Sequence, residues 1–164
     1  MLDRLIEFQL DHNAWATGRL IDACATLTPE QFERHMEIGP GSLQGTLSHI
    51  IETMFFFADC FTARHYENRS DFALKSRSVA GLQELLDRSS SELDTAINQA
   101  LAGGVPAELA WASSEHGRMS GPAAVAQVFD HGSYHRAQCM NMLKRLGVLP
   151  LPGVDPMSFE EALR

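Results

Sequence analysis

The helical character of the chain is clearest in one segment, residues 42–65, which reads SLQGTLSHIIETMFFFADCFTARH. It opens with Ser42, a typical N-cap residue, directly after the chain-breaking Gly39-Pro40-Gly41. Apolar residues then recur at steps of three and four, which is the spacing of one helix face. This stripe consists of Leu43, Leu47, Ile50, Met54, Ala58 and Phe61. The stretch therefore predicts a long amphipathic helix that buries one side.

Three other segments carry the same helical pattern. They run from about Leu2 to Thr26, from about Val79 to Ala102, and from Ser120 to Gly147. A short helix is expected after the capping sequence Thr28-Pro29-Glu30-Gln31. Four long helices that each have one apolar face predict an all-α fold, a four-helix bundle.

The connections indicate how the bundle is wound. Residues 66–77 are mostly polar, and twelve extended residues reach roughly 40 Å, the length of a long helix. The second and third long helices can therefore run parallel. Residues 105–119 lack a helical pattern and predict a short β-hairpin-like insert between the third and fourth long helices. In the tail, Ser158 is the expected cap of a last helical turn.

Composition narrows the class of protein. A length of 164 residues with 45% apolar residues predicts one domain, residues 1–164, with a sizeable core. The 13 basic and 21 acidic residues give a net charge of −8, which argues against nucleic acid as a partner. No apolar run approaches transmembrane length, so no membrane association is expected. Three widely spaced cysteines without a Cys-x-x-Cys motif are expected to be reduced, and the predicted location is cytoplasmic.

Three histidines are the candidate metal ligands. His131 and His135 are four residues apart, so a helix places both rings on one face. They belong to an apolar stripe that includes Val128 and Met142, where buried ring nitrogens need partners. His49 in the second long helix can supply a third ligand. Three protein ligands with one open position are typical of a catalytic metal site, not of a closed structural one.

Other polar residues have alternative interpretations. His12 is expected either to contact a substrate or to be a buried core histidine. Glu52 and Asp130 are candidates to orient a ligating imidazole, or are solvated carboxylates. His116 in the hairpin either overhangs the site or is a solvent-exposed loop residue. Cys139 is a weaker candidate for a fourth ligand.

The pattern of motifs resembles the DinB-like (DinB/YfiT) family of metalloenzymes. The sequence 12–16, HNAWA, resembles the family's Asn-x-Trp-Ala motif, and 47–49, LSH, resembles its metal histidine in the second helix. The sequence 130–138, DHGSYHRAQ, resembles its fourth-helix signature His-x-x-x-His-Arg-x-Gln, and 146–150, LGVLP, with Asp155 resembles the residues downstream. One difference is Ala137, where the family often has glycine.

The resemblance has consequences for fold and function. It implies an up-down-down-up bundle, a divalent metal on His49, His131 and His135, and a homodimer. The expected ion is zinc or nickel, and the expected partner is a small-molecule substrate. The implied reaction is transfer of a low-molecular-weight thiol, as a cofactor, to an electrophile, or else a hydrolysis. The alternative is a non-catalytic stress-response or interaction module whose ion is structural or sensory. The residues that would bind substrate or thiol, and any other catalytic residue, are not identified by the sequence.

Overall fold

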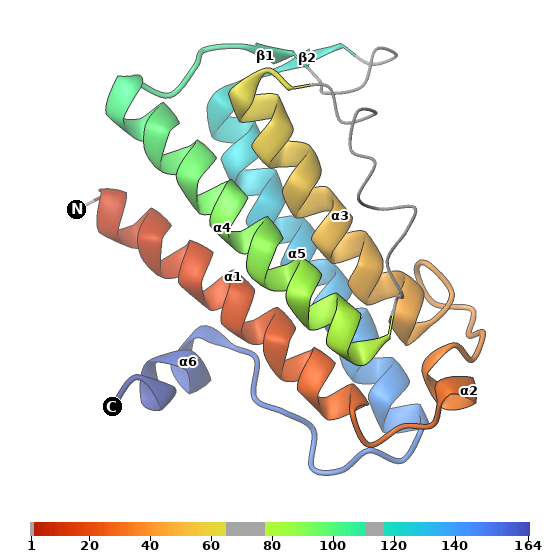
Figure 1. Ribbon diagram of the computed structural model, residues 1–164. Helices are drawn as coiled ribbons and strands as arrows, with labels where there is room; N and C mark the ends of the chain where they lie inside the picture. The colour runs from red at the N-terminus through yellow and green to blue at the C-terminus, as the bar shows by residue number, and fades with distance from the viewer. Residues whose placement is uncertain (1, 65–77, 111–116) are drawn as a thin grey trace.

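The computed structural model describes residues 2–64, 78–110 and 117–164, and the described part is mostly helical (Figure 1). A two-stranded antiparallel sheet is its only β-structure. In chain order the elements of the described residues are α1 (Leu2–Cys24), α2 (Pro29–Phe32), α3 (Leu43–Thr62), α4 (Val79–Gly103), β1 (Leu109–Ala110), β2 (Arg118–Met119), α5 (Gly121–Arg145) and α6 (Pro156–Ala162). The prediction of an all-α fold with a small β insert is confirmed.

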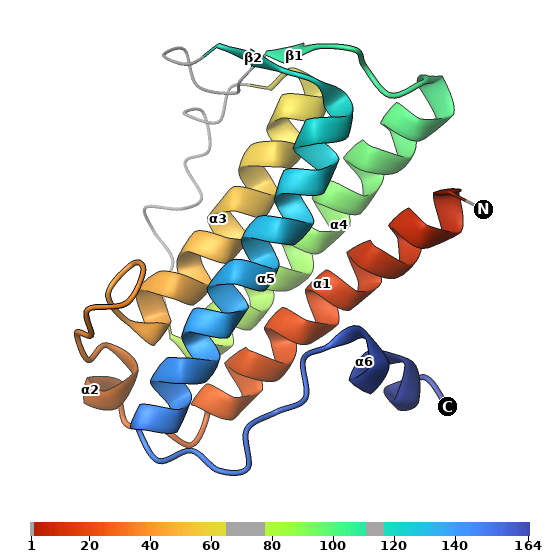
Figure 2. The ribbon, with the colours of Figure 1, turned by 180° about the vertical axis from the view of Figure 1, so that it is seen from behind.

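The four long helices α1, α3, α4 and α5 form the bundle. Helices α3 and α4 run in the same direction, and α1 and α5 run in the opposite one (Figures 1 and 2). Helix α3 packs against both α4 and α5, and α1 packs against the same two helices from the other side. This is the predicted up-down-down-up order. The predicted crossover, residues 66–77, lies outside the described residues.

Serine caps fix where the bundle helices begin. Ser42 Oγ accepts a hydrogen bond from the Gly45 N–H at 3.0 Å, and Ser120 Oγ accepts one from the Ala123 N–H at 3.2 Å. Helix α3 ends earlier than predicted, at Thr62 and not near His65. The reason is Ala63, which adopts a left-handed conformation with φ 55° and donates its N–H to the Asp59 carbonyl. His65 itself lies outside the described residues.

The core lies between the four long helices. Its largest fully buried side chains are Phe55, Leu20, Ile21, Leu43, Leu47, Ile50, Ile51, Leu82, Leu93, Ile97, Met142 and Leu143. In the aromatic run that follows Met54, Phe55 and Phe57 are buried and Phe56 is partly buried. No helix of the described residues is both long enough and apolar enough to cross a membrane.

The C-terminal tail folds back along α1 (Figure 2). The ring of Phe159 in α6 lies 5.3 Å from that of Phe8 and 5.2 Å from that of Trp15, measured between centroids. The predicted cap at Ser158 is wrong. Asp155 is the N-cap of α6, and its side chain accepts hydrogen bonds from the Met157 and Ser158 N–H groups. A carboxylate there complements the positive end of the helix dipole better than a hydroxyl does.

The predicted hairpin is present in its described part. Leu109 pairs with Met119 and Ala110 pairs with Arg118 in antiparallel register. Leu109 is buried against the core, and α5 begins directly after β2. The insert therefore connects the end of α4 to the start of α5, the helix that carries two of the three histidines.

Candidate metal centre

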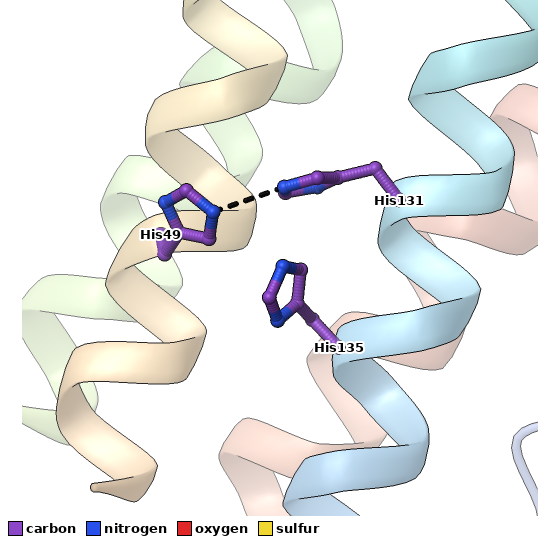
Figure 3. Close-up of side chains that lie close together, drawn as sticks. All are labelled: His49, His131 and His135. Carbon is purple, nitrogen blue, oxygen red and sulfur yellow. Dashed lines mark hydrogen bonds between the residues drawn. The ribbon is translucent and has the colours of Figure 1, made fainter. Parts of the chain in front are cut away.

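His49, His131 and His135 converge between two neighbouring helices. His49 comes from α3, and the other two come from successive turns of α5, with all three rings turned toward one another (Figure 3). One nitrogen of each ring can be chosen so that the three lie within 4.8 Å of one another. The His49 and His131 Nε2 atoms are 3.0 Å apart. Two residues that the sequence separates by 82 positions are thus in direct contact.

The spacing of the ring nitrogens fits a metal ion. With metal–nitrogen bonds of about 2.1 Å, adjacent ligand atoms lie about 3.4 Å apart in a tetrahedral site and about 3.0 Å apart in an octahedral one. The 3.0 Å between the His49 and His131 Nε2 atoms matches the octahedral value, and the ligand atoms of all three residues lie within 4.8 Å of one another. A shared proton between two imidazoles would also give this distance, but it would account for only two rings. The third ring in the same cluster favours an ion as the common partner.

Burial is uneven across the cluster. His135 is 8% exposed, whereas His49 and His131 are only partly buried, so the cluster is open on their side. Burial lowers the pKa of His131 to about 4, with smaller contributions from the neighbouring His135 and His49. Burial, and then His135, also lowers the pKa of His49. Both rings are therefore neutral at pH 7, the form that ligates a metal.

Gln138 is the hydrogen-bond partner of His135. The Gln138 Oε1 atom lies 2.8 Å from His135 Nδ1, one turn further along α5. With Nδ1 donating its proton to this oxygen, the Nε2 lone pair faces the cluster. The sequence had indicated Asp130 or Glu52 for such a role, and for His135 the structure gives it to Gln138. In the sequence, Gln138 is distinguished only as the last residue of the motif at 130–138.

The remaining sequence candidates lie elsewhere. His12 is a buried core histidine at 5% exposure, and its Nε2 pairs with the Val154 carbonyl at 2.9 Å. Cys139 is fully buried and is not part of the histidine cluster. Burial raises its pKa, so this residue is a neutral thiol. His116 lies outside the described residues.

A buried arginine joins α5 to α1 beside the cluster. Arg136 is 3% exposed, and its Nη1 donates to Asn13 Oδ1 at 2.5 Å. It also reaches Thr17 Oγ1 at 3.5 Å and Ser133 Oγ at 3.1 Å. Two motifs that are far apart in the sequence, at 12–16 and at 130–138, therefore meet in the fold. No role for Asn13 or Arg136 is predicted from the sequence, where their presence in these two motifs is the only signal that points to them.

A groove of about 660 Å³ lies between α1 and α4. It is lined by Ala14, Trp15, Gly18, Arg19, Asp22, Gln83, Leu86, Asp87 and Ser90. The histidine cluster is on α3 and α5, so this groove does not contain it. Shape alone would place a ligand in the groove, but the groove lacks converging nitrogen ligands. The chemistry points to the histidines.

The structure thus defines a helical bundle in which three histidines from two helices cluster at a partly open site. The model of the DinB family matches residues 1–162 of the 164-residue chain, and the chain belongs to this family. Comparison with curated proteins gave no match to the sequence. The match agrees with the resemblance carried by the three motifs, and the three-histidine group fits a metal-binding member of the family.

Proposed function

We propose that this protein is a metal-dependent enzyme in which His49, His131 and His135 hold one divalent ion, zinc or nickel. The observation that carries the proposal is the convergence of three imidazoles from α3 and α5. An imidazole that ligates a metal is uncharged, so the ion would keep its full positive charge. Such an ion supplies Lewis acidity, and it lowers the pKa of a water or thiol in its open position.

The residues around the cluster support a site that admits small molecules. His49 and His131 are partly exposed, so an ion held by the three histidines would be accessible from their side of the cluster. Tyr134 is 64% exposed, and its ring centroid lies 5.1 Å from that of His135, which puts an aromatic surface next to the site. We infer that the substrate is an electrophile that receives a low-molecular-weight thiol, with hydrolysis as the alternative reaction.

The core argues that the ion is not needed for folding. The cluster lies beside a continuous apolar core that extends over all four bundle helices. That core buries its apolar residues without any contribution from the ligands, and such burial is the main source of stability in a helical bundle. We therefore favour a catalytic ion over a structural or sensory one.

The experiment combines metal analysis with chelation. Protein purified without a histidine tag is expected to carry one divalent ion per chain, and the double variant His131→Ala/His135→Ala none. His49→Ala is expected to remain folded and to lose turnover in a screen of thiols with electrophiles. Full occupancy in the double variant would refute the ligand assignment. If chelation unfolds the protein and no substrate is turned over with metal restored, the structural-ion alternative replaces the enzyme.

A further inference from the structure

The Gln138 amide lies between His135 and the loop that joins α2 to α3. Its Oε1 is 2.8 Å from His135 Nδ1. An amide has two orientations, and they have opposite effects on the imidazole. With the oxygen facing the ring, Nδ1 carries the proton and Nε2 is free to ligate. With the NH₂ facing the ring, the proton moves to Nε2, and ligation through that atom is blocked.

Gly39 lies close to the Gln138 amide. A methyl group at position 39 would lie 2.0 Å from Gln138 Oε1 and 2.7 Å from its Cδ, so any side chain there would collide with the amide. Gly39 also has φ +49°, a conformation that glycine adopts most readily. Because of this close approach, the Gly39 backbone limits the positions that the Gln138 amide can adopt.

Backbone hydrogen bonds hold the turn that contains Gly39 in place. The Gly41 N–H donates to the Ile38 carbonyl at 3.0 Å and closes a tight turn around Gly39. The Met36 N–H donates to the Gly41 carbonyl at 2.7 Å and ties the turn to the rest of the loop. Ser42, the next residue, is the N-cap of α3, the helix that carries His49. The turn therefore connects the start of one ligand helix to a side chain on the other.

We propose that Gln138 is a positioning residue that sets the tautomer and orientation of His135, and that the turn at Gly39 holds Gln138 in place. The inference rests on the proposed function, because the ring that is positioned is a proposed metal ligand. It adds a part of the molecule, residues 36–41, that approaches the metal site through the Gln138 amide. A change in this loop should alter metal affinity although no ligand is touched.

The test uses four single variants, the double variant Gly39→Ala/Gln138→Leu, and cobalt(II) as the probe. Gln138→Leu removes the acceptor at similar size, and Gln138→Glu keeps an oxygen that can only accept. Gly39→Ala pushes the amide away. Gly147→Ala is the matched control, because Gly147 also has positive φ, 82°, but has open space around it. Affinity is measured by competition with a chelator, and the tautomer of His135 in metal-free protein by nitrogen-15 NMR of the imidazole.

We expect Gln138→Leu to weaken cobalt binding about 10- to 100-fold, the usual effect of losing a partner of a ligating histidine. Gly39→Ala should weaken binding in the same direction and should add nothing in the Gln138→Leu background. Gln138→Glu and Gly147→Ala should bind as the unmodified protein does. Unchanged affinity in Gln138→Leu, or equal losses in Gly39→Ala and Gly147→Ala, would overturn the proposal.

The NMR measurement separates this inference from the proposed function. Metal-free protein is expected to carry the His135 proton on Nδ1, and Gln138→Leu is expected to lose that preference. This result would support the positioning role even if the protein bound no metal, which would refute the proposed function alone. The same tautomer in both proteins would refute the positioning role, whatever the metal content.

Discussion

The contact between Arg136 and Asn13 yields a quantitative prediction about stability. Within the described residues, the hydrogen-bond acceptors of this buried guanidinium are the neutral oxygens of Asn13, Thr17 and Ser133. Burial lowers the pKa of Arg136 from 12.5 to about 10. At about 1.4 kcal/mol per pKa unit, holding the charge in this place costs on the order of 3 kcal/mol. Three hydrogen bonds of about 1 kcal/mol each offset that cost.

The two partners should therefore respond differently to replacement. Arg136→Met removes the cost of the buried charge but leaves the buried Asn13 Oδ1 without this donor, so stability should fall by only about 1 kcal/mol. Asn13→Leu leaves the charge buried and removes its shortest hydrogen bond, and it should destabilise the protein by about 3 kcal/mol. Asn13→Asp, the matched control, keeps an oxygen at the same place and adds an opposite charge. It should be much less destabilising than Asn13→Leu.

The assay is urea unfolding at pH 7, monitored by circular dichroism. The free energy of unfolding, extrapolated to zero urea, is compared among the variants. The double variant Asn13→Leu/Arg136→Met should be more stable than Asn13→Leu alone, because the unpaired charge is gone. The reasoning is refuted if Arg136→Met is as destabilising as Asn13→Leu. That result would mean that the arginine contributes net stability at this interface.

Further predictions concern packing at Gly132, the dependence of metal binding and stability on pH, and binding to DNA. Gly132→Ala should destabilise the protein by about 1–3 kcal/mol, although alanine favours helices, because its methyl group would lie 2.4 Å from Asn13 Oδ1; an unfolding curve equal to that of the unmodified protein would contradict this. Because the folded pKa of His131 is lowered to about 4, cobalt binding should persist at pH 6 and be lost as the pH falls towards 4. The metal-free protein should lose stability between pH 6.5 and 4, since the unfolded chain takes up this proton first; a pH titration of binding and of melting temperature checks both. The net charge of −8 predicts no duplex DNA binding, and sub-micromolar affinity that falls steeply with salt would disprove it.

Local patterns were sufficient for much of the fold. The apolar stripe and the cap Ser42 placed α3, and the long connection after it allowed the parallel pair of α3 and α4. The sequence-based predictions differ from the structure at two helix ends, where only a few residues determine the boundary. The end of α3 depends on the left-handed conformation of Ala63, and alanine is not a residue that signals it. The cap of α6 was assigned to Ser158 although Asp155 was the stronger candidate before Pro156.

For the candidate site too, some features could be predicted from local sequence and others could not. The spacing of His131 and His135 determines that their rings share a face, because the period of a helix is a local property of the chain. The resemblance to a family then indicated His49 as the third member, a position that periodicity alone did not require. The sequence also carried Gln138 in the same motif, but it could not say which polar residue faces which imidazole.

The sequence by itself determined the amphipathic helices, the caps Ser42 and Ser120, and the histidine pair on one helix turn, since each depends on residues only a few positions apart. Only the tertiary structure decided that His49 lies 3.0 Å from His131, that Asn13 receives Arg136, and that Gly39 borders Gln138. These contacts join residues that are 82 to 123 positions apart in the first two cases. Such contacts depend on how the four apolar faces pack together, and that packing is a property of the whole chain.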